Sequence, residues 1–210
     1  MSNILQEVNE IVGPTTEPIN LQDVLQHCNI AVTGGTQERM INDIFIPGAR
    51  QYLEIRTGLT LHQKTLEWVL SGFPSFGEPI TLRQATPLIS IASVKYKDSS
   101  GNESTWPSSN YIADTDSSVG RLVPAYNVPY PYPILYPSWP VRIRGTAGIE
   151  ATSPPTDAPA RVKYPLCMLT AAMWENREAE TIPERGVMNT LSFRYGVEAY
   201  IAALTREYAF

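Results

Sequence analysis

Histidine and cysteine are scarce in this sequence, with two of each among 210 residues. His27 and Cys28 are neighbours on an expected helix, where adjacent side chains point about 100° apart. They are therefore poorly placed to share a zinc ion, which wants three or four converging ligands. The sequence also has no glycine loop with the lysine that binds phosphate, and no serine in the pattern of a nucleophile elbow. We expect no metal, no cofactor and no catalytic activity.

Long apolar runs and an excess of basic charge are also missing. No stretch approaches the roughly 20 apolar residues of a membrane span, and the N-terminus lacks the basic start of a secretory signal. The net charge of −5 argues against a broad nucleic-acid-binding surface. We expect a globular protein made in the cytoplasm, in which Cys28 and Cys167 are buried free thiols. A disulfide between these two cysteines stays open as the alternative.

Two helices are expected near the N-terminus. Asn20 and Asp23 form a variant of the capping box, and apolar residues with helical spacing follow them. A second helix is expected from about Gln37 to Thr57, with Gly58 as its left-handed stop. Pro47 lies inside that helix and is expected to kink it or to split it in two.

From about residue 60 to 148 the apolar spacing changes to alternation, which predicts an antiparallel β region of five or six strands. A shift of phase at Ala92 and Ser93 indicates a β-bulge. The run from Asp98 to Asn102 is typical of a hairpin turn with Gly101 at positive φ. In the last strand Val141, Ile143 and Gly145 share one face, and Arg142 and Arg144 occupy the other.

Helical spacing returns after a linker rich in proline, serine and threonine. One helix is expected from Ala160, with Pro165 either starting its regular part or kinking it. The last helix presents Val197, Tyr200, Ile201 and Leu204 on one face. The fold class predicted is α+β, in which the N-terminal and C-terminal helix pairs pack together and a central antiparallel β lobe stands apart. The predicted divisions are an extension (1–18), N-terminal helices (19–58), a β lobe (59–148) with a Pro/Tyr-rich loop (124–140), a linker (149–158) and C-terminal helices (159–210).

The stretch from Asn127 to Pro140, NVPYPYPILYPSWP, holds five prolines, three tyrosines and a tryptophan. Because strands precede and follow it, it is expected to be a loop of one sheet and not a linker between domains. Its prolines restrict the backbone to extended or turn conformations. We predict a stiff, elongated loop that projects from the β lobe and contacts a neighbouring subunit or another protein. The anchors of that contact are predicted to be Tyr130, Tyr132, Tyr136 and Trp139.

Charged residues form two further candidate groups. Glu175, Arg177 and Glu178 follow one another at the end of the third helix, either as a solvated helix end or as salt bridges between subunits. Asp114 and Asp116 resemble the start of a calcium loop but lack its glycine and distal glutamate, which favours a solvated turn.

Several segments read together resemble the head–tail connector (adaptor) proteins of long-tailed bacteriophages. The segments are EPINLQDVLQHCNI, FIPGARQYLEIRTGLTL, ITLRQATPLISIASVKYKDSSGNESTWPSSNYIAD, WPVRIRGTAGI and MWENREAE, in that order. The resemblance covers about residues 15–206 and departs from the family at 125–138, where this chain is enlarged. It implies a structural protein, without enzymatic activity or a cofactor, that forms a twelve-fold ring in the virion neck after assembly in the host cytoplasm. The implied partners are the portal protein, a stopper or tail-completion protein, and further copies of the chain, with genomic DNA passing through without specific binding.

In such a ring the C-terminal end is our candidate for portal contact. Its apolar and aromatic residues would not be needed to hold the chain end of a lone monomer in place. The residues predicted to make this contact are Tyr195, Tyr200, Arg206, Tyr208 and Phe210. Arg142 and Arg144 are candidates to line the channel or to meet carboxylates of a partner. The alternative function is a carbohydrate- or peptide-binding module that uses the tyrosines, tryptophan and prolines of residues 127–140 as an aromatic platform.

Overall fold

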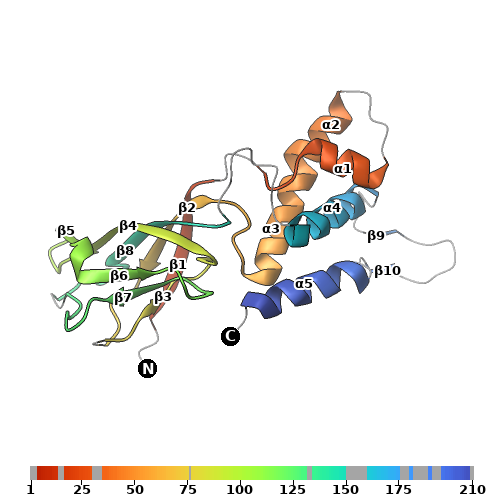
Figure 1. Cartoon of the computed structure of the whole chain (residues 1–210). Coiled ribbons are helices and arrows are strands. Elements are labelled where there is room, and N and C mark those ends of the chain that lie inside the picture. The colour runs from red at the N-terminus through yellow and green to blue at the C-terminus, as the bar shows by residue number, and fades with distance from the viewer. Residues whose placement is uncertain are drawn as a thin grey trace. The chain divides into compact units, whose positions relative to one another are not determined.

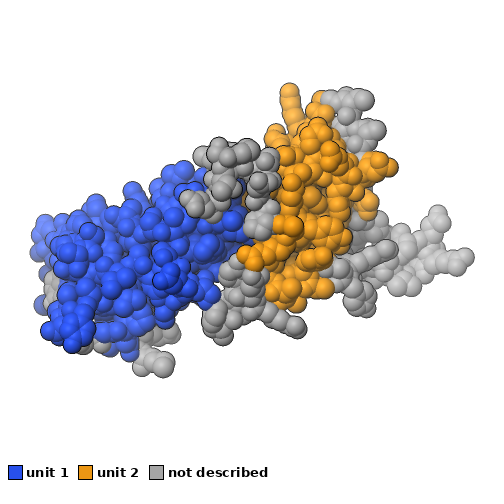
Figure 2. All heavy atoms as spheres, viewed as in Figure 1, with its two compact units in different colours: residues 1–15, 58–150 blue, residues 16–57, 151–210 orange. Residues whose placement is uncertain are grey.

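The chain divides into two compact units, shown in different colours in Figure 2. Unit 1 comprises Met1–Thr15 and Gly58–Glu150, and unit 2 comprises Thr16–Thr57 and Ala151–Phe210. The computed structural model describes residues 4–13, 17–29, 35–75, 77–131, 134–149, 160–175, 180–181, 189–190 and 195–208. Unit 1 carries the two larger antiparallel sheets and unit 2 carries the five α-helices of this described part (Figure 1). This arrangement confirms the predicted α+β fold class.

Unit 1 contains a five-stranded and a three-stranded antiparallel sheet. The larger sheet has the order β1 (Gln6–Val12), β2 (Lys64–Leu70), β8 (Val141–Ala147), β4 (Leu88–Lys97) and β5 (Glu103–Trp106). The smaller sheet has the order β3 (Ile80–Thr81), β7 (Arg121–Pro124) and β6 (Tyr111–Asp114), with a 3-10 turn (Ser108–Asn110) before β6. The described residues between 60 and 148 thus hold seven strands where five or six were predicted. β1 was not predicted as a strand, and it pairs with β2 at one edge of the larger sheet.

One hydrophobic core serves both sheets. Leu66, Trp68 and Leu70 point inward from β2, because residues two apart share a face of a strand. Ile80 and Leu122 reach the same core from the smaller sheet. The remaining members of the core are Leu82, Ala85, Leu88, Val94, Trp106, Tyr111, Tyr130, Val141, Ile143 and Ala147. With its inner face filled in this way, the larger sheet presents its alternate residues outward.

The pairing of β4 with β8 confirms the predicted bulge. The register shifts between Ile91 and Ser93, next to Gly145 on β8. A Cβ added at Gly145 would lie 2.5 Å from the carbonyl oxygen of Ser90 and 3.0 Å from the ring of Trp68. The close approach of three strands at this point therefore requires glycine.

The predicted hairpin turn between β4 and β5 is also confirmed. Gly101 has φ +86°, and the Asp98 carboxylate accepts hydrogen bonds from the backbone N–H groups of Ser100 (2.8 Å) and Asn102 (2.9 Å). Asn102 adds a side-chain hydrogen bond to Asp98. This turn chemistry is local, which is why it was visible in the sequence.

Unit 2 is a small helical bundle. Its helices are α1 (Leu21–Cys28), α2 (Thr36–Met40), α3 (Ile46–Thr57), α4 (Ala160–Glu175) and α5 (Tyr195–Tyr208), with a short strand pair β9 (Glu180–Thr181) and β10 (Asn189–Thr190). α4 packs against α1 and α3, and α5 packs against α3 and α4, so the N-terminal and C-terminal helices share one core. The buried apolar residues of this unit are Ile19, Val24, Ile41, Ile46, Ala49, Leu53, Val162, Leu166, Cys167, Leu169, Val197, Ile201 and Leu204.

The helix ends follow the predicted signals. Asn20 and Asp23 form a reciprocal capping box at the start of α1, and Gly58 follows α3 with φ +73°. The regular helix expected over 37–57 is interrupted just before Pro47. A π-helical turn, Ile41–Phe45, joins α2 to α3, and the Ile46 N–H donates to the carbonyl of Ile41 five residues back. Because proline has no N–H for the ordinary bond, a widened turn just before it lets the helix continue.

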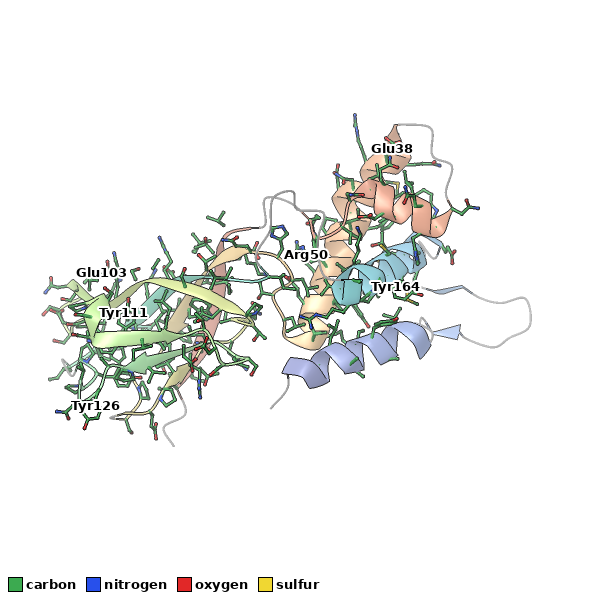
Figure 3. All side chains as sticks on the ribbon, in the orientation of Figure 1. Glu38, Arg50, Glu103, Tyr111, Tyr126 and Tyr164 are labelled. Atoms are coloured by element: carbon green, nitrogen blue, oxygen red, sulfur yellow. The ribbon has the colours of Figure 1, made fainter. Side chains whose placement is uncertain are left out.

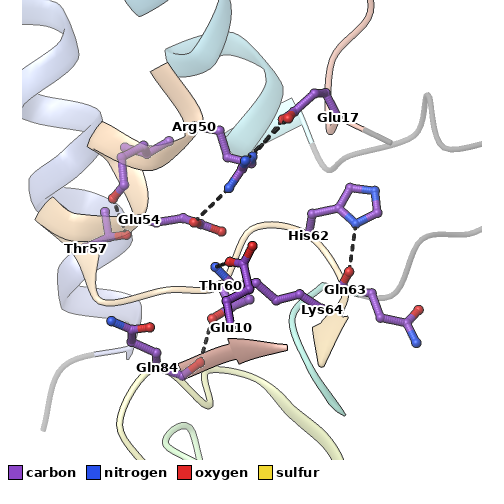
Figure 4. Close-up of polar contacts among 11 residues, drawn as sticks. Glu10, Glu17, Arg50, Glu54, Thr57, Thr60, His62, Gln63, Lys64 and Gln84 are labelled. Carbon is purple, nitrogen blue, oxygen red and sulfur yellow. Dashed lines mark hydrogen bonds and ion pairs between the residues drawn. The ribbon is translucent and has the colours of Figure 1, made fainter. Parts of the chain in front are cut away.

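A buried ion-pair network holds the middle of α3 within unit 2 (Figure 4). Arg50, whose side chain is 7% exposed, donates from Nε to Glu17 Oε2 at 2.7 Å and from Nη1 to Glu54 Oε2 at 3.1 Å. Its Nη2 also reaches the second oxygen of Glu17 at 3.4 Å. The segment before α1 is thereby tied to α3. None of the helices in the described parts of the chain is long and apolar enough to cross a membrane.

Candidate functional site

Tyr130, a predicted anchor for a neighbouring subunit, is instead a core residue. It is 1% exposed, its ring stacks on Phe73 at a centroid distance of 5.3 Å, and it lies tilted against Trp106 at 5.4 Å. Its hydroxyl donates to the carbonyl of Glu78 at 2.6 Å. The prediction of an intermolecular contact through Tyr130 is therefore wrong, because both the ring and the hydroxyl are already used within unit 1.

The proline–tyrosine segment is Asn127–Pro140. Beyond Tyr130, its described residues run alongside the β4–β5 hairpin. Leu135 forms an antiparallel bridge with Asp98, and the Tyr136 N–H donates to the carbonyl of Lys97 at 3.1 Å. Lys97 in turn donates its N–H to the carbonyl of Pro140 at 2.9 Å. Its prolines have no N–H, so in this pairing they can only accept, as Pro140 does, and the segment donates only from positions between them. Over 134–140 the segment therefore lies along its own sheet, which contradicts the prediction of a loop that projects from the β lobe.

Some aromatic and apolar side chains near this segment remain on the surface. Tyr136 is 42% exposed, Trp139 is half-buried, and Ile134 is largely exposed. Tyr126, labelled in Figure 3, is 99% exposed just before the segment. The predicted anchor Tyr132 lies outside the described residues. The surface candidates of this segment are thus Tyr136 and Trp139, and Tyr126 is an exposed aromatic that the predicted anchor set missed.

Arg142 and Arg144 lie on the outer face of the larger sheet, as their alternation with Val141 and Ile143 predicted. Both reach one carboxylate within unit 1: Arg142 Nη1 lies 3.3 Å from Glu67 Oε2, and Arg144 Nη2 lies 3.0 Å from Glu67 Oε1. Glu67 is buried beneath the two half-exposed arginines. Sequence reasoning did not single out Glu67, although its outward position on β2 was readable from the alternation around it.

The apolar face of the last helix is used inside unit 2. Val197, Ile201 and Leu204 of α5 are buried, whereas Tyr200 is partly exposed and its ring lies 5.2 Å from that of Tyr164. Tyr200 therefore lies at the edge of the helix interface, where its exposed part stays a candidate for the predicted portal contact. The side chains of Tyr195, Arg206, Tyr208 and Phe210 lie outside the described residues, as do Arg177 and Glu178. Glu175 is exposed at the end of α4.

The acidic residues and the cysteines raise the question of a metal site and of reactive thiols. Among the residues that the structure describes, no three His, Cys, Asp or Glu side chains are grouped so that they could hold a metal ion. Cys28 and Cys167 are free thiols. Burial raises the pKa of Cys167 to about 11, and burial followed by the nearby charge of Glu175 raises the pKa of Cys28. Both thiols are therefore protonated and poorly reactive near neutral pH.

Asp114 closes the β6–β7 hairpin through an ion pair and hydrogen bonds. Its carboxylate accepts from the Ser117 hydroxyl at 2.6 Å and from Arg121 at 2.7 and 3.0 Å. The hydrogen bond from Ser117, followed by that from Arg121, lowers the pKa of Asp114 from its usual 3.8 to about 2. The turn that resembled the start of a calcium loop is thus held by an ion pair and hydrogen bonds within the hairpin.

Replacement of Asp114 by asparagine is expected to remove a pH-dependent part of the stability. Because the folded-state pKa lies below the ordinary value, the carboxylate stabilises the fold above about pH 3.8, and this stabilisation is lost as the pH falls through about 2. Asp114→Asn should therefore lower the urea midpoint near pH 6, and its difference from the unsubstituted chain should shrink towards pH 2. The matched control is Asp116→Asn, an exposed residue of the same turn, whose midpoint should change little. A constant difference across this range would contradict the expectation.

The fold of the whole chain is similar to that of chains in solved structures of gene transfer agent (GTA) particles. One structure is the virion of a native GTA particle, and a second is the neck of an empty GTA particle computed with C6 symmetry. Each contains a chain with 19% sequence identity and a TM-score of 0.71, with 94% of both chains covered. A third, the neck of a native GTA particle computed with C12 symmetry, contains a chain with 18% identity and a TM-score of 0.70 over the same 94% of each chain. No protein-family model matches this sequence, and no curated protein matches it either. At these identities the likeness establishes a shared fold that includes both the helical unit and the β lobe.

Proposed function

We propose that this chain is a structural adaptor in the neck of a phage or phage-like particle. Copies of it form a ring, with twelve members, that joins the portal to a stopper or tail-completion protein. The ring surrounds the passage of the genomic DNA and does not bind it specifically. The role is one of assembly and not of catalysis.

The fold similarity is the observation that carries this proposal. It extends over 94% of both chains, and two of the structures described above are of the neck of a GTA particle, one of them computed with C12 symmetry. The match therefore includes both compact units and not one common domain alone. The order of the sequence segments that resemble phage adaptors supports the same function independently of the fold.

The carbohydrate- or peptide-binding alternative is less well supported. An aromatic platform needs exposed rings, and the ring of Tyr130 is buried in the core of unit 1. The neighbouring backbone is paired with Lys97 along the sheet. The aromatic side chains that remain exposed are separated from one another. Such a surface suits contact with a protein partner at least as well as contact with a sugar.

Ring formation is expected when the purified chain is mixed with the portal protein encoded by the same genome. Negative-stain microscopy should then show a second ring stacked on the portal ring. A monomeric chain in the absence of the portal would not contradict this expectation. A chain that stays monomeric with the portal present and binds a glycan array instead would reverse the choice between the two functions.

Removal of residues 206–210 is expected to weaken portal binding about tenfold or more. The reason is that the deletion removes Arg206, Tyr208 and Phe210, which are predicted to contact the portal. A deletion from 196 would also remove Val197, Ile201 and Leu204 from the core of unit 2, so loss of binding would then be ambiguous. The shorter deletion keeps these three residues. The measurement is a portal pull-down, with the melting temperature showing that the fold survives.

The control for this deletion is Ile112→Ala, which removes an exposed apolar side chain from unit 1. It should bind the portal as the unsubstituted chain does. Normal portal binding by the chain that ends at Thr205 would exclude the C-terminal end as the portal contact.

A further inference from the structure

Over its four strands β2, β8, β4 and β5, the outer face of the larger sheet carries an excess of positive charge. Glu7 of the edge strand β1 points to the same side, as the pairing partner of Val69, and adds one negative charge at that edge. We call basic face the six charged residues that point outward from β2, β8, β4 and β5. They are Glu67, Lys95, Lys97, Glu103, Arg142 and Arg144. Four are cations and two are anions, so the basic face has a net charge of +2. The whole chain has a net charge of −5, and the remainder therefore carries −7.

The register of the strands places like charges directly opposite each other on this face. Lys95 of β4 is the pairing partner of Arg142 of β8. Cross-strand pairs of equal charge destabilise a sheet. Val94 and Tyr96, beside Lys95, point to the core side, so this residue has no inward alternative. The sheet thus retains a repulsive pair at the centre of its outer face.

The two carboxylates of the basic face leave its cations incompletely satisfied. Arg142 and Arg144 share Glu67, each through a single hydrogen bond, although a guanidinium has five N–H donors and favours a two-bond fork with a carboxylate. Lys95 pairs with Glu103, labelled in Figure 3, at 2.7 Å. Four of these five side chains remain more than 40% exposed, and Glu67 is the exception. The face can therefore accept further carboxylates without breaking its present pairs.

The charge balance indicates what covers this face. Duplex DNA is poorly suited, because affinity for it grows with the number of phosphates neutralised and the rest of the chain repels a polyanion. A second copy of the chain is well suited, since it offers the complementary charge of −7 distributed outside the face. A ring of identical subunits requires contact between two different patches of one chain, and opposite net charges provide such a pair.

We propose that the basic face binds carboxylates on a neighbouring copy of this chain and forms one side of the contact between subunits. This inference rests on the proposed ring and adds to it the surface and the chemistry of the subunit contact. The exposed guanidinium groups of Arg142 and Arg144 form ion pairs across the contact. Lys95 and Lys97 come within reach of acidic side chains of the neighbour.

The test is carbodiimide cross-linking of assembled rings made from a mixture of unlabelled and ¹⁵N-labelled chains. The reagent joins a lysine amine to a carboxylate at zero length, and a cross-link with one labelled and one unlabelled peptide arises only between copies. We expect mixed-isotope cross-links through Lys95 or Lys97. Arg142→Glu combined with Arg144→Glu should reduce them about tenfold or more, because like charges then face each other across the contact.

Arg39→Glu combined with Arg83→Glu is the matched control, since it makes the same change in net charge at two exposed arginines outside the face. It should leave these cross-links unchanged. Rings that form without mixed cross-links through Lys95 or Lys97, or that keep them in the Arg142/Arg144 variant, overturn this inference and leave the adaptor function intact. A short duplex DNA that is bound by the chain and released by the Arg142/Arg144 variant would assign the face to DNA instead. Failure of any ring to form with the portal would count against the adaptor function as well.

Discussion

Tyr130→Ala is expected to lower the free energy of unfolding by about 3–5 kcal/mol, the usual cost of removing a large aromatic side chain from a core. The ring of Tyr130 fills the space between Phe73 and Trp106, and alanine would leave a cavity there. Urea denaturation followed by tryptophan fluorescence measures this loss. Trp106 is a nearby reporter, so the same experiment detects a local rearrangement of unit 1.

Tyr136→Ala is the matched control, because it removes the same side chain from the same segment at a position that is 42% exposed. Its effect should stay within about 0.5 kcal/mol. Tyr130→Phe should cost about 1 kcal/mol, since it removes only the hydrogen bond to the carbonyl of Glu78. Similar losses for the alanine variants at 130 and 136 would show that the segment does not pack as described.

Arg50→Ala is expected to destabilise unit 2 by about 3–5 kcal/mol, because it removes one partner from a buried ion pair. The Arg50 side chain lies between Glu17 and Glu54, which are themselves mostly shielded from water (Figure 4). Without the guanidinium the two carboxylates keep their desolvation cost and lose their closest cation. Thermal unfolding followed by circular dichroism at the helical signal measures the effect.

Arg56→Ala is the control for this prediction, since it lies on the same helix α3 and also pairs with a glutamate, Glu198. Both partners of that pair are about half exposed, so its removal should cost only about 0.2–1 kcal/mol. Added salt should weaken the contribution of Arg56 and leave that of Arg50 largely unchanged. Equal losses for the two variants would contradict the ranking by burial.

Elements whose causes lie within a few residues were predicted correctly. The capping box of Asn20 and Asp23, the positive φ of Gly58 and the hairpin closed by Asp98 depend on short-range hydrogen bonds and on the backbone freedom of glycine. The alternation in β8 and the bulge in β4 follow from the two-residue period of a strand. Pro47 predicted an interruption of the regular helix, but the sequence did not show that a π-helical turn, Ile41–Phe45, would bridge it.

The candidate site was predicted less completely, since its residues meet over long stretches of chain. Glu67 and Arg144 are 77 positions apart, and only strand pairing brings them together on the outer face of the sheet. β1 was overlooked because an edge strand with Glu7, Asn9 and Glu10 has the charge of a surface segment. Its pairing with β2 supplies what its composition does not indicate.

The proline–tyrosine segment separates most clearly what the sequence determines by itself from what needs the tertiary structure. The five prolines of Asn127–Pro140 determine that this stretch is extended or turned and that it is poorly able to join a sheet along its full length. They do not determine which side of it meets the rest of the protein. That choice depends on Phe73, Trp106 and Glu78, more than 20 positions away, which surround Tyr130, whereas Tyr136 remains at the surface. The physical reason is that backbone restriction acts within neighbouring residues, whereas burial is decided by distant parts of the chain that collapse onto the same core.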